Sequence, residues 1–277
     1  MTESRPSPPG GRIGLALGGG AARGWAHIGV IRALRQQGIE PSIIAGTSVG
    51  AIVAAMFCNG RLDAFETWVR SLKRRDVLSY IDVNLGHGGF IQGHRLMAQL
   101  DRTLGAVDFA DLQRPLGVVA TDLYSGQERW LRRGDLASAV RASMALPGLF
   151  TPVYRDSEWL ADGGLVNPVP ISLCHAMGAD RVIAVNLSDG LMGRRIPAQP
   201  ADASAPPGVL DVIATAVNVM QDRITRSRMA GDPPDLLIAP QLAHIDLLEL
   251  HRADDAIAEG EAAVARLQPA IETFLRD

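Results

Sequence analysis

The chain has 277 residues, of which 47% are hydrophobic, and its formal net charge is −3. This composition supplies enough apolar material for one sizeable core. The lack of any basic excess argues against a nucleic-acid-binding protein. No stretch approaches the roughly eighteen apolar residues that a membrane-spanning helix requires.

Residues 1–11 are rich in Pro, Ser and Gly and contain no apolar segment typical of a secretory signal. We expect them to form a disordered tail, with residues 12–277 folding as a single domain in the cytoplasm. Cys58 and Cys174 each lie in an apolar stretch without metal-ligating neighbours. We therefore expect two buried thiols and no metal site.

The first half of the chain alternates short apolar strands with helices. The expected elements are a strand at 12–17, a helix at 23–37 ended by Gly38, a strand at 42–45, and helices at 49–58, 63–75 and 94–104. Strands and helices that alternate through short links predict parallel strands covered by helices.

The second half continues this alternation and shows no internal repeat. The expected elements are strands at 116–122 and 127–131, a helix at 136–146, an extended piece at 159–160, a helix at 171–177, a strand at 181–186, a helix at 209–229, a strand at 236–239 and a helix at 253–275. The Pro- and Ala-rich segment 189–208 is expected to be a mobile loop. The predicted fold class is α/β, with a mostly parallel central sheet and helices on both faces in three layers.

The segment Gly46-Thr47-Ser48-Val49-Gly50 matches the G-x-S-x-G pattern of a nucleophile elbow between a strand and a helix. Gly46 and Gly50 leave room where side chains would collide in so tight a turn. The helix that follows favours negative charge near the Ser48 hydroxyl. An ordinary helix N-cap formed by Thr47 or Ser48 is the alternative.

The loop from Gly18 to Gly24 joins the first strand to the first helix. A dinucleotide fingerprint would need glycines where Ala21 and Arg23 stand, so this interpretation is disfavoured. The favoured interpretation is an oxyanion hole, because glycines let several amides turn toward one point. The loop and the elbow both follow strands at their carboxyl ends, where ligands bind in open α/β sheets.

A nucleophilic serine needs a group that accepts its proton. Asp162 follows an apolar strand and precedes Gly163 and Gly164. A plain Asp-Gly turn would explain it alone, but together with the elbow and the glycine loop it becomes the candidate base. Apolar neighbours are expected to raise its pKa. Those neighbours are Trp159, Leu160 and Leu165. The late histidines are more typical of structural or surface positions: His175, His244 and His251.

Four segments together resemble the patatin-like phospholipases, in particular the bacterial branch related to the catalytic domain of neuropathy target esterase. They are LALGGGAARGWAHIGVIRAL, GTSVGAIVAAMF, ASMALPGLFTPV and DGGLVNPVPI, within residues 13–185. The resemblance implies a dyad without histidine, with Ser48 as the nucleophile and Asp162 as the base, and neither metal nor cofactor. It also implies a lipid or acyl-ester substrate.

The same resemblance implies that the amides of Gly19, Gly20 and Ala21 form the oxyanion hole and that Arg23 closes the loop. Ala21 stands where the family usually has a third glycine. If this position requires a positive φ, alanine costs about 1 kcal/mol.

The sequence therefore predicts a serine acyl-ester hydrolase of the phospholipase or lysophospholipase type. Three alternatives stay open: a thioesterase or acyltransferase that uses the same elbow, a nucleotide-binding regulatory protein, and a catalytically silent protein. Phe90-Ile91 and the segment 146–150 are candidates for an acyl tunnel or a peripheral membrane contact, with core packing as the alternative.

Overall fold

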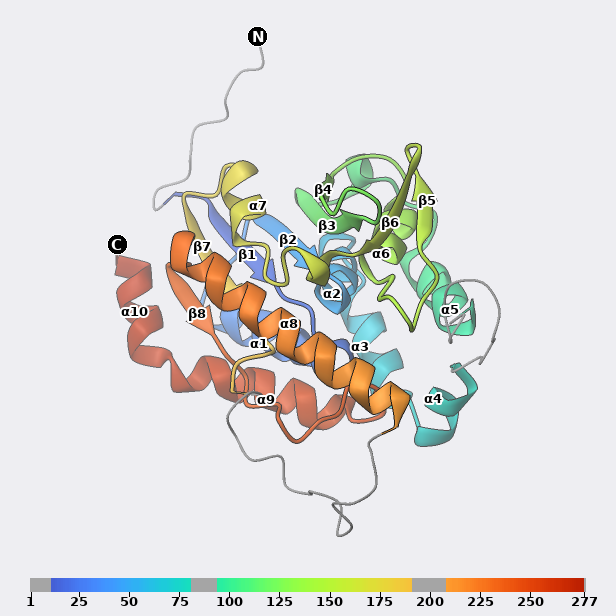
Figure 1. Cartoon of the computed structure of the whole chain (residues 1–277). Coiled ribbons are helices and arrows are strands. Elements are labelled where there is room, and N and C mark those ends of the chain that lie inside the picture. Colours follow the sequence, from blue (N-terminus) through green and yellow to red (C-terminus); the bar gives the residue numbers. More distant parts are fainter. Residues whose placement is uncertain (1–10, 81–93, 191–207, 277) are drawn as a thin grey trace.

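An eight-stranded sheet lies at the centre of the protein in the computed structural model, which describes residues 11–80, 94–190 and 208–276 (Figure 1). The strands are β1 (Ile13–Leu17), β2 (Ile43–Thr47), β3 (Leu116–Asp122), β4 (Glu128–Leu131), β5 (Val153–Arg155), β6 (Glu158–Asp162), β7 (Arg181–Val185) and β8 (Leu236–Ile238). Their order is β5-β6-β3-β2-β1-β7-β8, and β4 also pairs with β3. Strands β3, β2, β1, β7 and β8 run parallel, whereas β4, β5 and β6 are antiparallel additions. The predicted mostly parallel sheet is confirmed.

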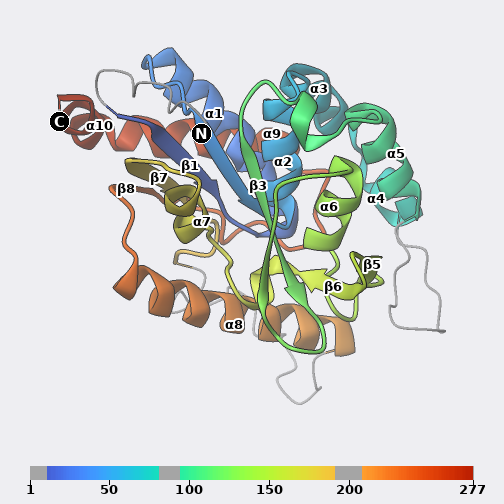
Figure 2. The same ribbon diagram turned by 90° about the horizontal axis from the view of Figure 1, so that it is seen from above.

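Helices cover both faces of this sheet, which confirms the predicted three layers (Figure 2). The α-helices are α1 (Ala26–Gln36), α2 (Val49–Cys58), α3 (Leu62–Ser71), α4 (Arg74–Tyr80), α5 (His94–Leu104), α6 (Leu136–Ser143), α7 (Ile171–Ala176), α8 (Val209–Gly231), α9 (Ala253–Arg266) and α10 (Gln268–Arg276). Short 3₁₀ helices are η1 (Ala21–Trp25), η2 (Phe109–Asp111) and η3 (Gly163–Leu165). Helices α1, α2 and α9 lie on one face, and α7 and α8 lie on the other (Figure 2).

The central strands divide their side chains between two hydrophobic clusters. On β1, Leu15 and Leu17 pack in the larger cluster with α1, α2 and α9, while Ala16 packs on the opposite face with α7. On β7, Val185 and Ala184 divide in the same way. Successive side chains of a strand point to opposite faces, so strands that are covered on both sides read as the continuous apolar runs seen in the sequence.

Several elements differ in extent from the sequence prediction. The helix expected at 63–75 is interrupted by Leu72, which is extended, so α3 and α4 are separate helices. The helix expected at 253–275 divides at Leu267, and Pro269, which has no amide to donate, stands in the first turn of α10. Strand β5 was not predicted. The predicted features at residues 1–10, 84–93 and 191–207 lie outside the described residues.

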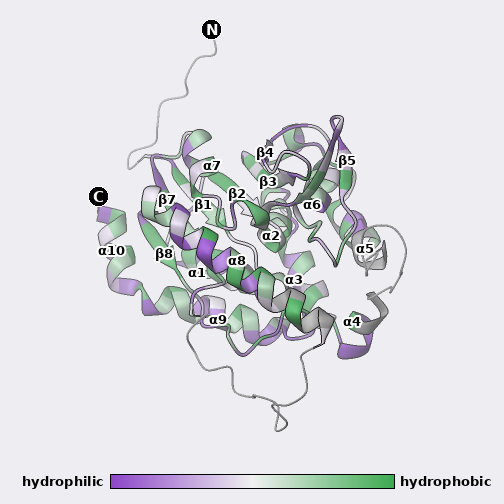
Figure 3. Ribbon diagram, viewed as in Figure 1, coloured by the Kyte–Doolittle hydropathy of each residue, from purple (hydrophilic) through white to green (hydrophobic). Residues whose placement is uncertain are grey.

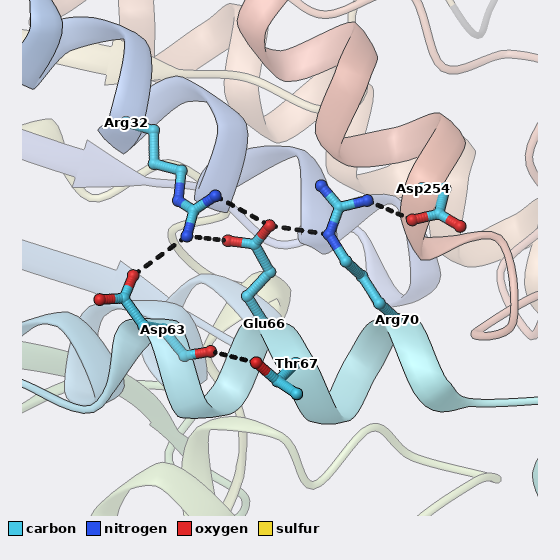
Figure 4. A network of polar contacts seen from close by, with 6 residues as sticks. All are labelled: Arg32, Asp63, Glu66, Thr67, Arg70 and Asp254. Carbon is cyan, nitrogen blue, oxygen red and sulfur yellow. Dashed lines mark hydrogen bonds and ion pairs between the residues drawn. The ribbon is translucent and has the colours of Figure 1, made fainter.

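A network of ion pairs joins three helices on the α1 side of the sheet (Figure 4). The buried carboxylate of Glu66 on α3 lies 2.7 Å from Arg32 Nη2 of α1 and accepts a 2.7 Å hydrogen bond from Arg70 Nε. Arg32 also contacts Asp63 at 3.0 Å, and Arg70 contacts Asp254 of α9. A buried carboxylate is stable only when it is paired. The network is therefore a structural link between α1, α3 and α9.

Both cysteines are buried free thiols, as predicted. Cys58 ends α2, and burial raises the pKa of its thiol to about 12. Among the helices in the described ranges, none is long and apolar enough to cross a membrane.

Candidate active site

The ends of β2 and β6 meet along one edge of β3, and the site lies where they meet. Val119 of β3 pairs with Thr47, the last residue of β2, and the next residue, Ala120, pairs with Asp162, the last residue of β6. Strand β4 occupies the other edge of β3 at both positions. Because β2 runs parallel and β6 antiparallel to β3, the two strands end against each other. Ser48, which follows β2, is thereby brought to Asp162.

The Ser48 hydroxyl Oγ donates a hydrogen bond of 2.7 Å to Asp162 Oδ2. The other carboxylate oxygen, Oδ1, accepts from the amide of Gly164 at 2.7 Å, and Thr121 Oγ1 donates to the Asp162 carbonyl oxygen at 2.8 Å. Each oxygen of the carboxylate thus accepts one hydrogen bond, Oδ2 from the serine and Oδ1 from the double-glycine turn. The two residues that the sequence singled out lie within hydrogen-bonding reach.

Asp162 is 1% exposed. Burial raises the pKa of its carboxyl group from 3.8 to about 6, against the opposing effect of the hydrogen bonds from Ser48 and Gly164. Leu160 is buried as expected, but Trp159 is 41% exposed and packs against the tilted ring of Tyr154 instead. The expected contribution of Trp159 to this burial is therefore wrong, because alternate residues of β6 face opposite sides of the sheet.

The backbone of Ser48 is held in a strained conformation, with φ 55° and ψ −125°. A Cβ at Gly50 would lie 2.2 Å from the Leu17 carbonyl oxygen, and one at Gly46 would lie 2.6 Å from the Cα of Ala51. The two glycines therefore let the first turn of α2 press against β1 and β2. Such strain at a single half-buried serine is typical of a nucleophile elbow.

Residues at the end of α6 hydrogen-bond to the backbone of both Ser48 and Asp162. These residues were not assigned to the site from the sequence. Ser143 Oγ accepts a 2.8 Å hydrogen bond from the Ser48 amide, and the Ala145 carbonyl oxygen accepts one of 2.9 Å from the Asp162 amide. Ser143 is fully buried. The signal that could have found it is the ASMALPGLF segment, which lies far from the elbow in the chain.

The glycine loop lies against the elbow, since a Cβ at Gly19 would come 3.4 Å from the Cβ of Ser48. The amide of Gly18 donates to the Val185 carbonyl oxygen at 3.1 Å, and that of Gly19 to the Pro168 carbonyl oxygen at 3.0 Å. This differs from the expectation that the Gly19 amide faces the substrate. In the described part of the chain, the amides of Gly20 and Ala21 donate no hydrogen bond.

Two buried side chains, His27 and Arg23, hold the glycine loop in place. His27 Nε2 lies 2.7 Å from the Gly18 carbonyl oxygen, and burial lowers the pKa of this imidazole to about 4. The neutral ring therefore donates through Nε2. Arg23 is also buried, its pKa is lowered to about 10, and its Nη2 donates to Asn218 Oδ1 of α8 at 2.9 Å. These contacts connect the glycine loop to α1 and to α8.

Ala21 has a φ of 49°, so the position that the sequence singled out does adopt a left-handed conformation. Ala21→Gly is expected to raise the free energy of unfolding by up to about 1 kcal/mol, because glycine adopts this conformation without the Cβ clash. Urea unfolding measures the change. Ala22→Gly, at the buried neighbouring residue, is the matched control and should lower stability. If both variants change the free energy of unfolding equally and in the same direction, the left-handed conformation of Ala21 is not the cause.

No histidine whose side chain the structure describes bonds with Ser48. His27 contacts the glycine loop, His175 contacts the Ala179 carbonyl oxygen and Asp232, and His244 is exposed. Within residues 11–80, 94–190 and 208–276, no group of three or more His, Cys, Asp or Glu side chains could hold a metal ion. The described chemistry at this edge of the sheet is that of a hydroxyl, one carboxylate and backbone amides.

Comparison with known proteins gives a consistent result. A family model described as patatin-like phospholipase matches residues 15–175. An uncharacterized NTE family protein of Mycobacterium bovis is 31% identical over 94% of this chain and 92% of its own length. The neuropathy target esterase sws of Drosophila melanogaster is 33% identical over 64% of this chain, but only 13% of that protein is covered. The crystal structure of VipD from Legionella pneumophila has a similar fold, with a TM-score of 0.52 over 94% of this chain and 67% of that one, at 16% identity.

Proposed function

Because the chain belongs to the patatin-like phospholipase family, we propose that it is a serine acyl-ester hydrolase of the phospholipase or lysophospholipase type. The observation that carries the proposal is the 2.7 Å hydrogen bond from Ser48 Oγ to Asp162 Oδ2. A nucleophile and a base in direct contact, on a strained turn at a helix N-terminus, are what covalent acyl transfer requires.

In the proposed first step, Asp162 accepts the Ser48 proton while Oγ attacks the carbonyl carbon of the ester. The carbonyl π electrons move onto oxygen. When this intermediate collapses, the bond to the alkoxy oxygen breaks, and the leaving oxygen takes the proton from Asp162. A pKa of about 6 suits Asp162 to both tasks, because the group is ionised at neutral pH yet more basic than an ordinary aspartate.

The negative charge on the intermediate needs donors that are already in place. The amides of Gly20 and Ala21 are the candidates, since they donate no hydrogen bond to the described residues and follow Gly19, which lies beside Ser48. Preorganised amides of this kind are worth about 10²- to 10³-fold each in kcat. The proposed oxyanion hole therefore has two amides rather than the three expected from the sequence.

The second step releases the acyl group. Water takes the place of the leaving alcohol, gives a proton to Asp162 and attacks the acyl carbon. When this second intermediate collapses, the bond from Oγ to the acyl carbon breaks, Oγ takes the proton back from Asp162, and the fatty acid is released. An apolar cluster begins at Leu146, the residue after Ala145, whose carbonyl oxygen accepts from the Asp162 amide, and it is the proposed contact for the acyl chain. It consists of Leu146, Leu149 and Val217, with Phe150 packed against it.

The nucleotide-binding alternative loses support from the loop geometry. Phosphate binding at a glycine loop uses amides that point at the ligand. Here the amides of Gly18 and Gly19 are engaged with Val185 and Pro168, and the Cα of Gly19 faces Ser48. The loop therefore packs against the serine site, and its Gly18 and Gly19 amides cannot bind a phosphate.

The proposal is tested with p-nitrophenyl acyl esters of increasing chain length and with a fluorophosphonate probe. The protein is expected to hydrolyse at least the esters that its apolar cluster accommodates, and peptide mass spectrometry should find the probe on Ser48. Added glycerol distinguishes a hydrolase from an acyltransferase, because a transferase would convert part of the acyl group to a glyceryl ester. A folded protein that neither hydrolyses any ester nor reacts with the probe would refute the proposed function.

A further inference from the structure

Helix α8 packs beside the site with several polar residues on its inner face. The face that packs on the protein carries polar residues beside the buried Val217, whereas Val212, Val219 and Met220 are 38% to 49% exposed. The described buried polar residues of α8 are Gln221, Asp222 and Thr225. Figure 3 shows hydrophilic and hydrophobic stretches mixed along α8. A surface helix normally turns its apolar side to the core, so a polar inner face indicates that α8 lines a site there.

The polar residues on this inner face differ in what they contact. Asn218 accepts from Arg23 Nη2 at 2.9 Å, and Asp222 accepts from Arg226 Nε at 3.0 Å. Gln221 is 7% exposed, yet its carboxamide makes no hydrogen bond with any residue in the described ranges. Its carboxamide atoms are not sealed from solvent, so water or a bound substrate can supply the missing hydrogen-bond partners. Thr225 Oγ1 also lacks a hydrogen-bond partner among the described residues, but it is fully buried, so Gln221 is the unpartnered side chain on this face that a ligand can reach.

The Gln221 carboxamide lies between Gly19 of the glycine loop and Gly164 of the double-glycine turn. A Cβ at Gly164 would come 2.3 Å from Gln221 Nε2 and 2.9 Å from Asp162 Oδ1. A Cβ at Gly19 would come 3.9 Å from the same Nε2 and 3.4 Å from the Ser48 Cβ. The amide nitrogen therefore lies close to Gly164 and the Oδ1 side of Asp162, with Gly19 next to it.

We propose that Gln221 binds the leaving-group oxygen of the substrate ester and so positions an aliphatic alcohol, such as a glyceryl group, for departure. This inference rests on the proposed function. The leaving oxygen must lie close to the Asp162 carboxyl group, which returns a proton to it, and Gln221 Nε2 borders that carboxyl group beside the Gly164 turn. The Gly20 and Ala21 amides are the candidates for binding the carbonyl oxygen. A donor at the leaving oxygen strengthens its hydrogen bond as negative charge develops there.

The dependence on the leaving group distinguishes this role from a structural one. An aliphatic alcohol is a poor leaving group and needs a donor and a proton, whereas p-nitrophenolate departs as an anion at neutral pH. The test compares p-nitrophenyl butyrate with glyceryl monobutyrate, which share one acyl chain. The readout is kcat/KM, because it reports the acylation step in which the leaving group departs.

Gln221→Ala and the nearly isosteric Gln221→Met are both expected to lower kcat/KM for glyceryl monobutyrate by about 10- to 100-fold, with the loss in kcat rather than KM. For p-nitrophenyl butyrate the change should stay within about threefold. Met220→Ala, at the exposed neighbour on α8, is the matched control and should leave both substrates unaffected. Thermal unfolding and the rate of fluorophosphonate labelling verify that the fold and Ser48 are intact.

Losses of equal size on the two esters, or no loss on either, would overturn the role of Gln221 while leaving the hydrolase intact. If the wild-type protein hydrolyses neither ester and resists the probe, the proposed function itself fails. The two failures are therefore distinguished by the wild-type protein alone.

Discussion

Ser48→Ala is expected to reduce ester hydrolysis by about four to six orders of magnitude and to abolish labelling by the fluorophosphonate probe. Alanine removes the only proposed nucleophile, and the Asp162 Oδ2 oxygen then loses the partner that it holds at 2.7 Å. The fold should persist, because Ser143 contacts the backbone amide of residue 48, and alanine retains that amide. Turnover of a p-nitrophenyl ester, with thermal unfolding alongside, measures both effects.

The matched control is Ser71→Ala at the end of α3, whose hydroxyl donates to the Trp68 carbonyl oxygen, away from the site. It should hydrolyse and label as the wild-type protein does. Retention of more than about one percent of activity by a folded Ser48→Ala protein would show that another group forms the acyl intermediate.

Asp162→Asn is expected to lower kcat by about 10³- to 10⁵-fold, because an amide cannot accept the Ser48 proton. In the wild-type protein, kcat/KM should rise about tenfold for each pH unit up to an apparent pKa near 6 and then level off. This direction follows from the raised pKa of Asp162, which is about 6, since only the ionised carboxylate can act as the base. Initial rates on one p-nitrophenyl ester over a pH series measure both.

The same substitution should increase stability at neutral pH. The folded protein holds the Asp162 proton more tightly than the unfolded chain does, with a pKa of about 6 against 3.8. The stabilisation from that proton is complete below the unfolded value and is lost as pH rises through 6. Asparagine avoids this loss, so we expect a gain of about 1 to 3 kcal/mol that is present at about pH 8 and absent at about pH 4.

Asp156→Asn is the matched control for these measurements, because Asp156 lies exposed in the β5–β6 turn of the same hairpin. It should change neither the pH profile nor the stability difference between the two pH values. An Asp162→Asn enzyme with ordinary turnover, or a wild-type rate that falls as pH rises through 6, would contradict the role of Asp162 as the base.

Much of the fold was predictable from local sequence, because its signals act over a few residues. The apolar runs of β1, β2, β3 and β7, and the limits of α2 and α5, were predicted to within about two residues. The family was identifiable from four short segments, and the membership is confirmed. Gly46 and Gly50 could be assigned to a tight turn, since the steric demand of an elbow is itself local.

Tertiary structure alone decided what surrounds the two candidate residues. Ser48 and Asp162 are 114 positions apart, and they meet because β2 and β6 end against each other on the same edge of β3. The order of strands in a sheet depends on long-range pairing, which no local pattern encodes. For the same reason the sequence could not reveal the contact of Ser143 with the elbow, the engagement of the Gly19 amide by Pro168, or the arrival of Gln221 from α8.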